Sequence, residues 1–156
     1  MSAPLAGLRA VEIGGGVGGA WCGRMLADLG MEVLRVEPEG GDPLRRRREV
    51  PGDPATEGLL FAWLDHGKTP AEGDLDALIE GADLLILGEE AARPAPGARP
   101  RAATLDLRWF AGGGARSDWK GSDAVVQALI GMIHVVGPVD AAPQQLGDLQ
   151  AAMVGG

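Results

Sequence analysis

The chain has 156 residues and contains one cysteine, no tyrosine, two phenylalanines and four tryptophans. The single cysteine, Cys22, excludes a disulfide within the chain and is typical of a reducing compartment, so we expect a cytoplasmic protein. Because aromatic residues are scarce, aliphatic side chains and alanines must fill the core. Cys22 falls on the apolar side of an expected helix, where we expect it to pack as a small hydrophobic residue.

Targeting, membrane and metal-binding signals are also missing from the sequence. No positively charged segment precedes an apolar run at Met1–Pro4, so we expect no signal peptide. No apolar run approaches the roughly 18 residues that a membrane span needs, and no Cys/His cluster has metal spacing. The net charge of −8 argues against a nucleic-acid partner, although Arg45–Arg48 forms one local positive patch. We therefore expect a small-molecule ligand and no metal.

The pattern of apolar residues predicts an α/β protein. Leu8–Ile13 is a short apolar run that ends in glycines, as a buried parallel strand does, and Met31–Val36 is a second one. Between them, Ala20–Leu29 has helical spacing and Gly30 stands where helices end. This βαβ unit and the length of the chain predict one Rossmann-like domain over residues 1–156, an open parallel sheet with flanking helices.

The remaining elements are shorter and separated by loops. Glu37–Gly58 is rich in Pro, Gly, Arg and acidic residues and is expected to form a long surface loop. Ala91–Pro100 is expected to be a connector. The other expected elements are helices at Leu59–Leu64, Leu75–Ile79, Asp123–Val136 with Asp123 as N-cap, and from about Leu149, and strands at Asp83–Leu87 and Ala102–Trp109.

The segment Gly14–Gly19 contains G-x-G-x-x-G between a predicted strand and a predicted helix. Glycines there allow the backbone to approach a pyrophosphate at a helix N-terminus, and Glu37 stands where an acid accepts ribose hydroxyls. This pattern alone favours NAD or FAD binding. The alternative is that the glycines only form a tight strand-to-helix turn.

Four ordered blocks resemble the family III CoA-transferases, which include formyl-CoA transferase and α-methylacyl-CoA racemase. The blocks are Pro4–Arg9, Val36–Arg45, Phe61–Lys68 and Asp123–Met132. An NAD enzyme has no need of the last three. The resemblance covers nearly the whole chain, but it extends only over the N-terminal part of the family.

The resemblance implies that the domain binds coenzyme A or an acyl-CoA as substrate. The glycine loop would approach the acyl-thioester end, and the segments after the second strand and around the Gly-Lys turn would flank the nucleotide and its phosphates. The residues implied are Gly15, Gly16, Val17, Glu37, Arg45, His66, Gly67 and Lys68. Family members form dimers, so we also expect a homodimer or a complementing chain.

The family transfers CoA between carboxylic acids, and the resemblance implies an aspartate nucleophile in the pattern V-G-x-x-x-A-D-x-x-x-G. Aligning Gly147 and Gly156 with its two glycines places Ala152 at the aspartate. Asp148 is the nearest acid and is retained as a displaced candidate nucleophile. Ser122 replaces the histidine that the racemase branch needs. Catalysis is therefore expected to be impaired.

One further segment departs from the family pattern. After Leu85–Leu87 the family has a stretch that helps to hold CoA, whereas Glu89 and Glu90 stand here and would repel phosphates. We therefore keep three hypotheses: a CoA-binding family III chain without its own nucleophile, an NAD- or FAD-binding module, and a non-catalytic interaction partner.

Overall fold

A computed structural model describes residues 3–47, 58–89, 91 and 101–156. These residues form two compact units, one ending at Leu107 and the other comprising Arg108–Gly155. The Rossmann-like architecture belongs to the first unit. That the whole of residues 1–156 acts as one domain stays a prediction.

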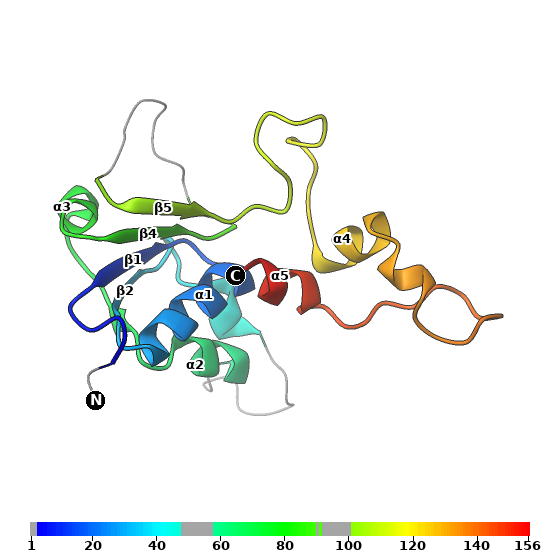
Figure 1. The fold of residues 1–156 in the computed structure, drawn as a ribbon, viewed down its shortest axis with the longest axis horizontal. Helices are drawn as coiled ribbons and strands as arrows, with labels where there is room; N and C mark the ends of the chain where they lie inside the picture. Colours follow the sequence, from blue (N-terminus) through cyan, green and yellow to red (C-terminus); the bar gives the residue numbers. More distant parts are fainter. Residues whose placement is uncertain (1–2, 48–57, 90, 92–100) are drawn as a thin grey trace. The chain divides into compact units, whose positions relative to one another are not determined.

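The first unit contains a five-stranded parallel sheet in the order β3-β2-β1-β4-β5 (Figure 1). The α/β fold class is therefore confirmed. The strands are β1 (Arg9–Ile13), β2 (Glu32–Val36), β3 (Thr69–Pro70), β4 (Leu84–Leu87) and β5 (Ala103–Asp106). The expected strand at Ala102–Trp109 is shorter than predicted, and the expected loop at Glu37–Gly58 contains η1 (Pro43–Arg46), while 48–57 lie outside the described residues.

Helices pack on both faces of the sheet. They are α1 (Val17–Asp28), α2 (Leu59–Asp65) and α3 (Leu75–Glu80). Side chains of β1 alternate between the two faces, so Ala10 packs with the α1 residue Leu26 and Val11 packs with the α3 residue Leu78. Both predicted helices after α1 are confirmed, and α1 begins three residues earlier than predicted.

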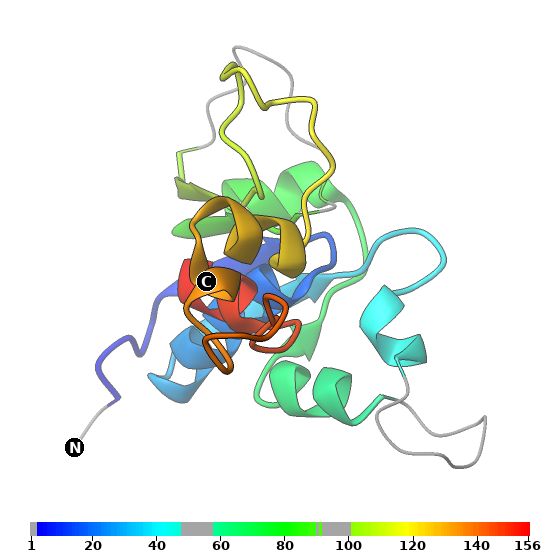
Figure 2. The ribbon, with the colours of Figure 1, turned by 90° about the vertical axis from the view of Figure 1, so that its right-hand side faces the viewer.

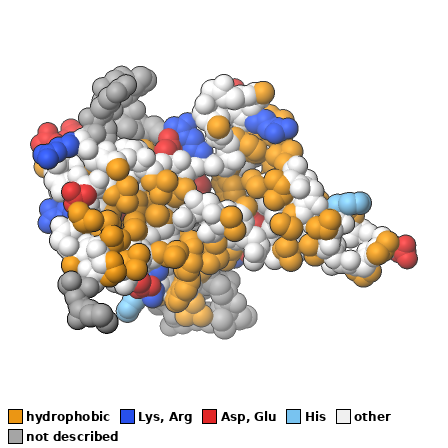
Figure 3. All heavy atoms as spheres, viewed as in Figure 1, with side chains coloured by type: hydrophobic (Ala, Val, Ile, Leu, Met, Phe, Trp, Pro, Cys, Tyr) orange, Lys and Arg blue, Asp and Glu red, His pale blue; other side chains and the backbone are white. Residues whose placement is uncertain are grey.

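A third apolar cluster joins the start of α1 to η1 and α2. It contains Ala20, Leu44, Phe61 and Leu64, with Val17 and Trp21 packed against it. η1 and α2 pack side by side (Figure 2). Hydrophobic side chains gather over α1 and α2 on the face shown in Figure 3. Met25 of α1 and Trp63 of α2 are each nearly half exposed. No helix among the described residues is long and apolar enough to cross a membrane.

The core packing of Cys22 is confirmed. Its half-buried side chain lies against the cluster of Ala10, Val33 and Ile86. Burial, and then the charge of Glu12, raises the pKa of the thiol, which makes it a poor nucleophile at neutral pH.

The second unit contains α4 (Asp123–Leu129), η2 (Met132–His134) and α5 (Gln150–Gly155). A continuous helix over Asp123–Val136 is wrong, because Gly131 has a left-handed φ of 77° and interrupts it. Asp123 as N-cap is also wrong: Ser122 caps α4, and its Oγ accepts the Val125 N–H at 3.4 Å. The last helix begins one residue after the predicted start.

Candidate functional site

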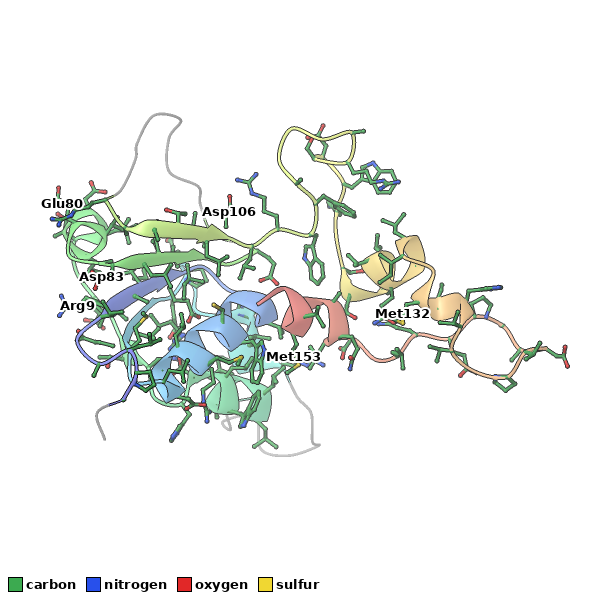
Figure 4. The ribbon with its side chains drawn as sticks, viewed as in Figure 1. Arg9, Glu80, Asp83, Asp106, Met132 and Met153 are labelled. Carbon is green, nitrogen blue, oxygen red and sulfur yellow. The ribbon has the colours of Figure 1, made fainter. Side chains whose placement is uncertain are left out.

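The strand order places a topological switch between β1 and β4, the position at which open parallel sheets bind ligands. Figure 4 shows Arg9 and Asp83 near the amino-terminal ends of these strands, where the Arg9 N–H donates to Asp83 Oδ2 at 2.9 Å. Asp106 lies at the carboxyl end of β5, toward the opposite edge (Figure 4). The glycine turn that follows β1 is at this carboxyl edge.

The glycine turn packs directly against the loop that follows β4. A Cβ at Gly88 would lie 2.5 Å from the carbonyl oxygen of Gly15, and one at Gly14 would lie 2.6 Å from the backbone nitrogen of Ala91. Both glycines are therefore required for the two loops to approach each other. Gly15 is buried within this contact.

The start of α1 carries the other two predicted residues of the turn. Gly16 has a φ of 108° and precedes α1, and Val17 is the first residue of the helix. Val17 packs against the apolar cluster of Leu44 and Phe61. The turn thus joins β1 to the helix as predicted, and its approach to an acyl thioester stays a prediction.

Glu89, which follows β4, occupies the glycine turn. Its Oε1 accepts the Gly18 N–H at 3.3 Å, and a Cβ at Gly16 would lie only 1.6 Å from its Oε2. The carboxylate thus occupies the space at the start of α1 that a side chain at position 16 would fill. A pyrophosphate entering this turn would meet a negative charge, which argues against the dinucleotide hypothesis. Glu90 lies outside the described residues.

Glu37 and Arg45 are brought together, and they pair with each other. Arg45 donates from Nε to Oε2 of Glu37 at 2.9 Å and from Nη2 to Oε1 at 2.5 Å. The Asp42 N–H also donates to Oε2 of Glu37, at 3.0 Å. The hydrogen bond from Arg45, followed by those from the Asp42 backbone and from Arg35, lowers the pKa of Glu37 to about 2 against the opposing effect of burial. Because both oxygens of Glu37 already accept protein donors, the acid is not available to a ribose in this conformation.

Arg35 is a site residue that the sequence did not reveal. Its side chain is 3% exposed and forms ion pairs with Glu37, at 2.8 Å, and with Asp65. The guanidinium carbons of Arg35 and Arg45 lie 4.8 and 4.1 Å from the centre of the Phe61 ring. The signal for this cluster was an arginine inside the apolar run of β2, because a charged residue at a buried strand position needs a partner.

Lys68 lies in the core, whereas a phosphate ligand would require its ammonium at the surface. Its Nζ donates to Glu12 Oε2 at 2.7 Å and to the Ala20 carbonyl at 2.8 Å, and the two side chains are 0% and 2% exposed. Burial raises the pKa of Glu12, and the adjacent Lys68 opposes that shift. A Cβ at Gly23 would lie 2.1 Å from Glu12 Oε2, so α1 needs a glycine to accommodate the pair.

The turn from His66 to Lys68 is present as predicted. His66 follows α2, Gly67 has a φ of 83°, and both are exposed. Contact of His66, Gly67 and Lys68 with a nucleotide phosphate stays a prediction, and in this structure the ammonium of Lys68 is paired with Glu12.

In the second unit, the backbone of Ala152, the residue that the sequence analysis aligns with the family's nucleophile, is hydrogen-bonded to the buried carboxylate of Asp123. Oδ1 of Asp123 accepts the N–H groups of Ala151 at 2.6 Å and of Ala152 at 3.1 Å. Gln127 donates from Nε2 to Asp123 Oδ2 and to the Gly147 carbonyl at 2.9 Å. Asp123 therefore caps α5 from α4, a role that local sequence patterns do not reveal.

Asp148 is exposed and precedes α5 by two residues. The helical spacing that would place Asp148 and Ala152 on one face does not apply, because Asp148 is outside the helix. A nucleophilic role for Asp148 stays a prediction. Among the residues that the structure describes, no group of three His, Cys, Asp or Glu side chains is arranged to hold a metal ion.

The model of CoA-transferase family III matches residues 5–87, which contain the glycine turn, Arg35, Glu37 and Lys68. This chain belongs to CoA-transferase family III. The match covers more than half of the chain and confirms the family resemblance over the first three sequence blocks, whereas the block Asp123–Met132 lies outside the matched residues.

Several curated relatives are similar over most of the family III chain. It is 29% identical to succinate–glutarate CoA-transferase of Agrobacterium fabrum, over 92% of this chain and 42% of that protein. It is 30% identical to the probable CoA-transferase Rv1866 of Mycobacterium tuberculosis, over 77% of this chain and 17% of that protein. The chain thus spans less than half the length of these relatives.

Solved structures agree with the fold. A CAIB/BAIF family protein from Brucella suis superposes with a TM-score of 0.81 at 21% identity, over 98% of this chain and 46% of that one. Rv3272 from Mycobacterium tuberculosis gives a TM-score of 0.75 at 25% identity, over 99% of this chain and 48% of that one.

Proposed function

We propose that this chain binds a CoA thioester at the carboxyl edge of its parallel sheet and serves in CoA transfer between carboxylic acids, without supplying the nucleophile. Family III membership over residues 5–87 carries the first part of the proposal. The alanine at position 152, where the family pattern has aspartate, carries the second. CoA or an acyl-CoA is accordingly the proposed substrate.

The proposed chemistry explains why position 152 matters. In nucleophilic CoA transfer, a carboxylate oxygen attacks the thioester carbonyl, the C–S bond breaks, and CoA leaves as the thiolate. The acyl group then remains on the carboxylate as a mixed anhydride. An alanine methyl has no lone pair with which to begin this step. Ala152, whose backbone N–H donates to Asp123 at the start of α5, therefore cannot act as the nucleophile.

The electrostatics of the first unit support binding through backbone donors and apolar contacts. Arg35 and Arg45 are paired with Glu37, and Lys68 is paired with Glu12. These cations are neutralised by the protein, so they offer less attraction to phosphates than their charges alone indicate. We therefore propose that CoA binding depends only weakly on salt concentration.

A complementing chain is a second part of the proposal. Two relatives are named as the alpha and beta subunits of succinyl-CoA–L-malate CoA-transferase of Chloroflexus aurantiacus, with 32% and 36% identity over 47% and 42% of this chain. By these names, two different chains, each similar to part of this one, are subunits of one kind of enzyme. We propose that a second copy or a different family chain contributes the carboxylate that is absent here.

A calorimetric titration of the full chain with CoA, acetyl-CoA and NAD tests the proposal. We expect both CoA compounds to bind and to raise the melting temperature, since a ligand at about 100 times its Kd stabilises a fold by about 2.7 kcal/mol. NAD should have no effect, because Glu37 and the glycine turn are already occupied. Binding of NAD without CoA would overturn the proposal. Absence of binding by all three would contradict a ligand site on this chain alone and favour the non-catalytic partner hypothesis.

A further inference from the structure

The carboxylate of Glu89 lies in the turn between β1 and α1 although its own strand is β4. Its Oε1 accepts the Gly18 N–H at 3.3 Å, and its Oε2 is 1.6 Å from where a Gly16 Cβ would stand. The side chain and the glycine therefore fit each other: a residue with a Cβ at position 16 would displace the carboxylate. The two loops also approach closely at Gly88, where only a glycine fits against the Gly15 carbonyl.

The location of this carboxylate has a consequence for ligands. The turn lies at the switch between β1 and β4, the edge at which parallel sheets bind their ligands. The N–H groups at the start of a twelve-residue helix favour negative charge, and here an acidic side chain of the protein already supplies it. A second anion brought into the same turn is repelled by the first and must compete for the same donors.

We propose that Glu89 is a specificity-determining residue that excludes anionic acyl ends from the glycine turn. The chain would then accept CoA thioesters of uncharged, monocarboxylic acyl groups in preference to those of dicarboxylic acids. This inference rests on the proposed function, and in particular on the glycine turn facing the acyl end of the thioester. It separates this chain from relatives whose names state a dicarboxylate substrate, such as succinate–glutarate CoA-transferase.

Two thioesters of equal chain length provide the test. Butyryl-CoA and succinyl-CoA both carry four-carbon acyl groups, and they differ in a terminal methyl against a terminal carboxylate. We expect the full wild-type chain to bind butyryl-CoA at least about tenfold more tightly, which corresponds to about 1.4 kcal/mol. In Glu89→Gln, which keeps the shape and removes the charge, the affinity for succinyl-CoA should rise while that for butyryl-CoA stays the same.

Glu72→Gln is the matched control, because it removes the same charge from an exposed position in the same unit. It should leave the ratio of the two affinities unchanged. A second measurement needs no thioester: the amide resonance of Gly18 should shift in Glu89→Gln and not in Glu72→Gln. That shift checks both the folding of the variant and the position of the carboxylate.

Each outcome decides the question. The inference is overturned if Glu89→Gln changes both affinities by the same factor or changes neither, or if the Gly18 resonance does not respond. If neither thioester binds to any of the three proteins while Gly18 responds as expected, the proposed function fails and the specificity role fails with it. Both the proposed function and the specificity role are supported if the wild type and Glu72→Gln bind butyryl-CoA more tightly than succinyl-CoA and only Glu89→Gln narrows that difference.

Discussion

Oδ1 of Asp123 accepts the backbone N–H of Ala152 at 3.1 Å, so a carboxylate at the start of α4 fixes the start of α5. The same oxygen accepts the Ala151 N–H, and Gln127 donates to the other oxygen of the carboxylate. Two short helices that cannot be stable alone are thereby joined. The backbone of Ala152, which we propose stands where the family pattern has its aspartate, is thus fixed by Asp123.

Replacement of Asp123 should therefore destabilise the chain. Asp123→Ala leaves two N–H groups of α5 without their acceptor and removes one of the two acceptors of the Gln127 amide nitrogen. We expect a loss of about 1–3 kcal/mol in the free energy of unfolding. Urea denaturation measures it. Asp140→Ala, at an exposed position, is the control and should change the free energy by less than about 0.5 kcal/mol. Equal effects of the two substitutions would contradict the capping role.

Lys68 is expected to matter for stability more than for ligand binding. Lys68→Met leaves the carboxylate of Glu12 buried without its cation, and the expected loss is about 3–5 kcal/mol. The double variant Glu12→Leu, Lys68→Met should recover much of this loss, because no charge then remains buried. Thermal unfolding of the three proteins checks the prediction, and a double variant less stable than Lys68→Met would contradict it.

Much of the first unit was predictable because its information is local. The apolar runs of β1 and β2, with Gly30 after α1, predict a βαβ unit from the spacing of neighbouring residues. The break at Gly131 was not predicted, because a glycine inside a helical pattern is tolerated in other helices. The left-handed φ of Gly131, which interrupts this helix, is known only from the structure.

The partners of the charged residues were beyond sequence analysis. The pairs Glu12–Lys68 and Asp123–Ala152 join residues 56 and 29 positions apart, and no local pattern records which groups meet. The sequence did predict that Glu89 would oppose phosphate binding, but only the fold reveals that its carboxylate reaches the Gly18 amide.

The ion pair of Glu37 should make stability depend on acidic pH. The pKa of Glu37 is about 2 in the folded chain against an ordinary 4.5, so the unfolded chain binds the proton more readily. The stability that Glu37 contributes is complete above about pH 5 and is lost as the pH falls from there toward 2. Denaturation at pH 7 and pH 3 should show a smaller loss in Glu37→Gln than in the wild type. The exposed control Glu39→Gln should match the wild type, and identical pH profiles for all three proteins would contradict the assignment.

The most direct measurement of the central claim is CoA transfer by Ala152→Asp beside the wild type and Ala152→Asn. The full chain is assayed with butyryl-CoA and labelled butyrate, alone and with any chain that co-purifies with it. Loss of a nucleophile typically costs at least about a thousandfold in rate, so we predict no transfer by the wild-type chain alone and transfer raised at least about a hundredfold in Ala152→Asp. Ala152→Asn, which has the same shape without a carboxylate, should remain inactive. Transfer by the isolated wild-type chain at the rate of Ala152→Asp would contradict the claim that position 152 is where this chain lost its nucleophile.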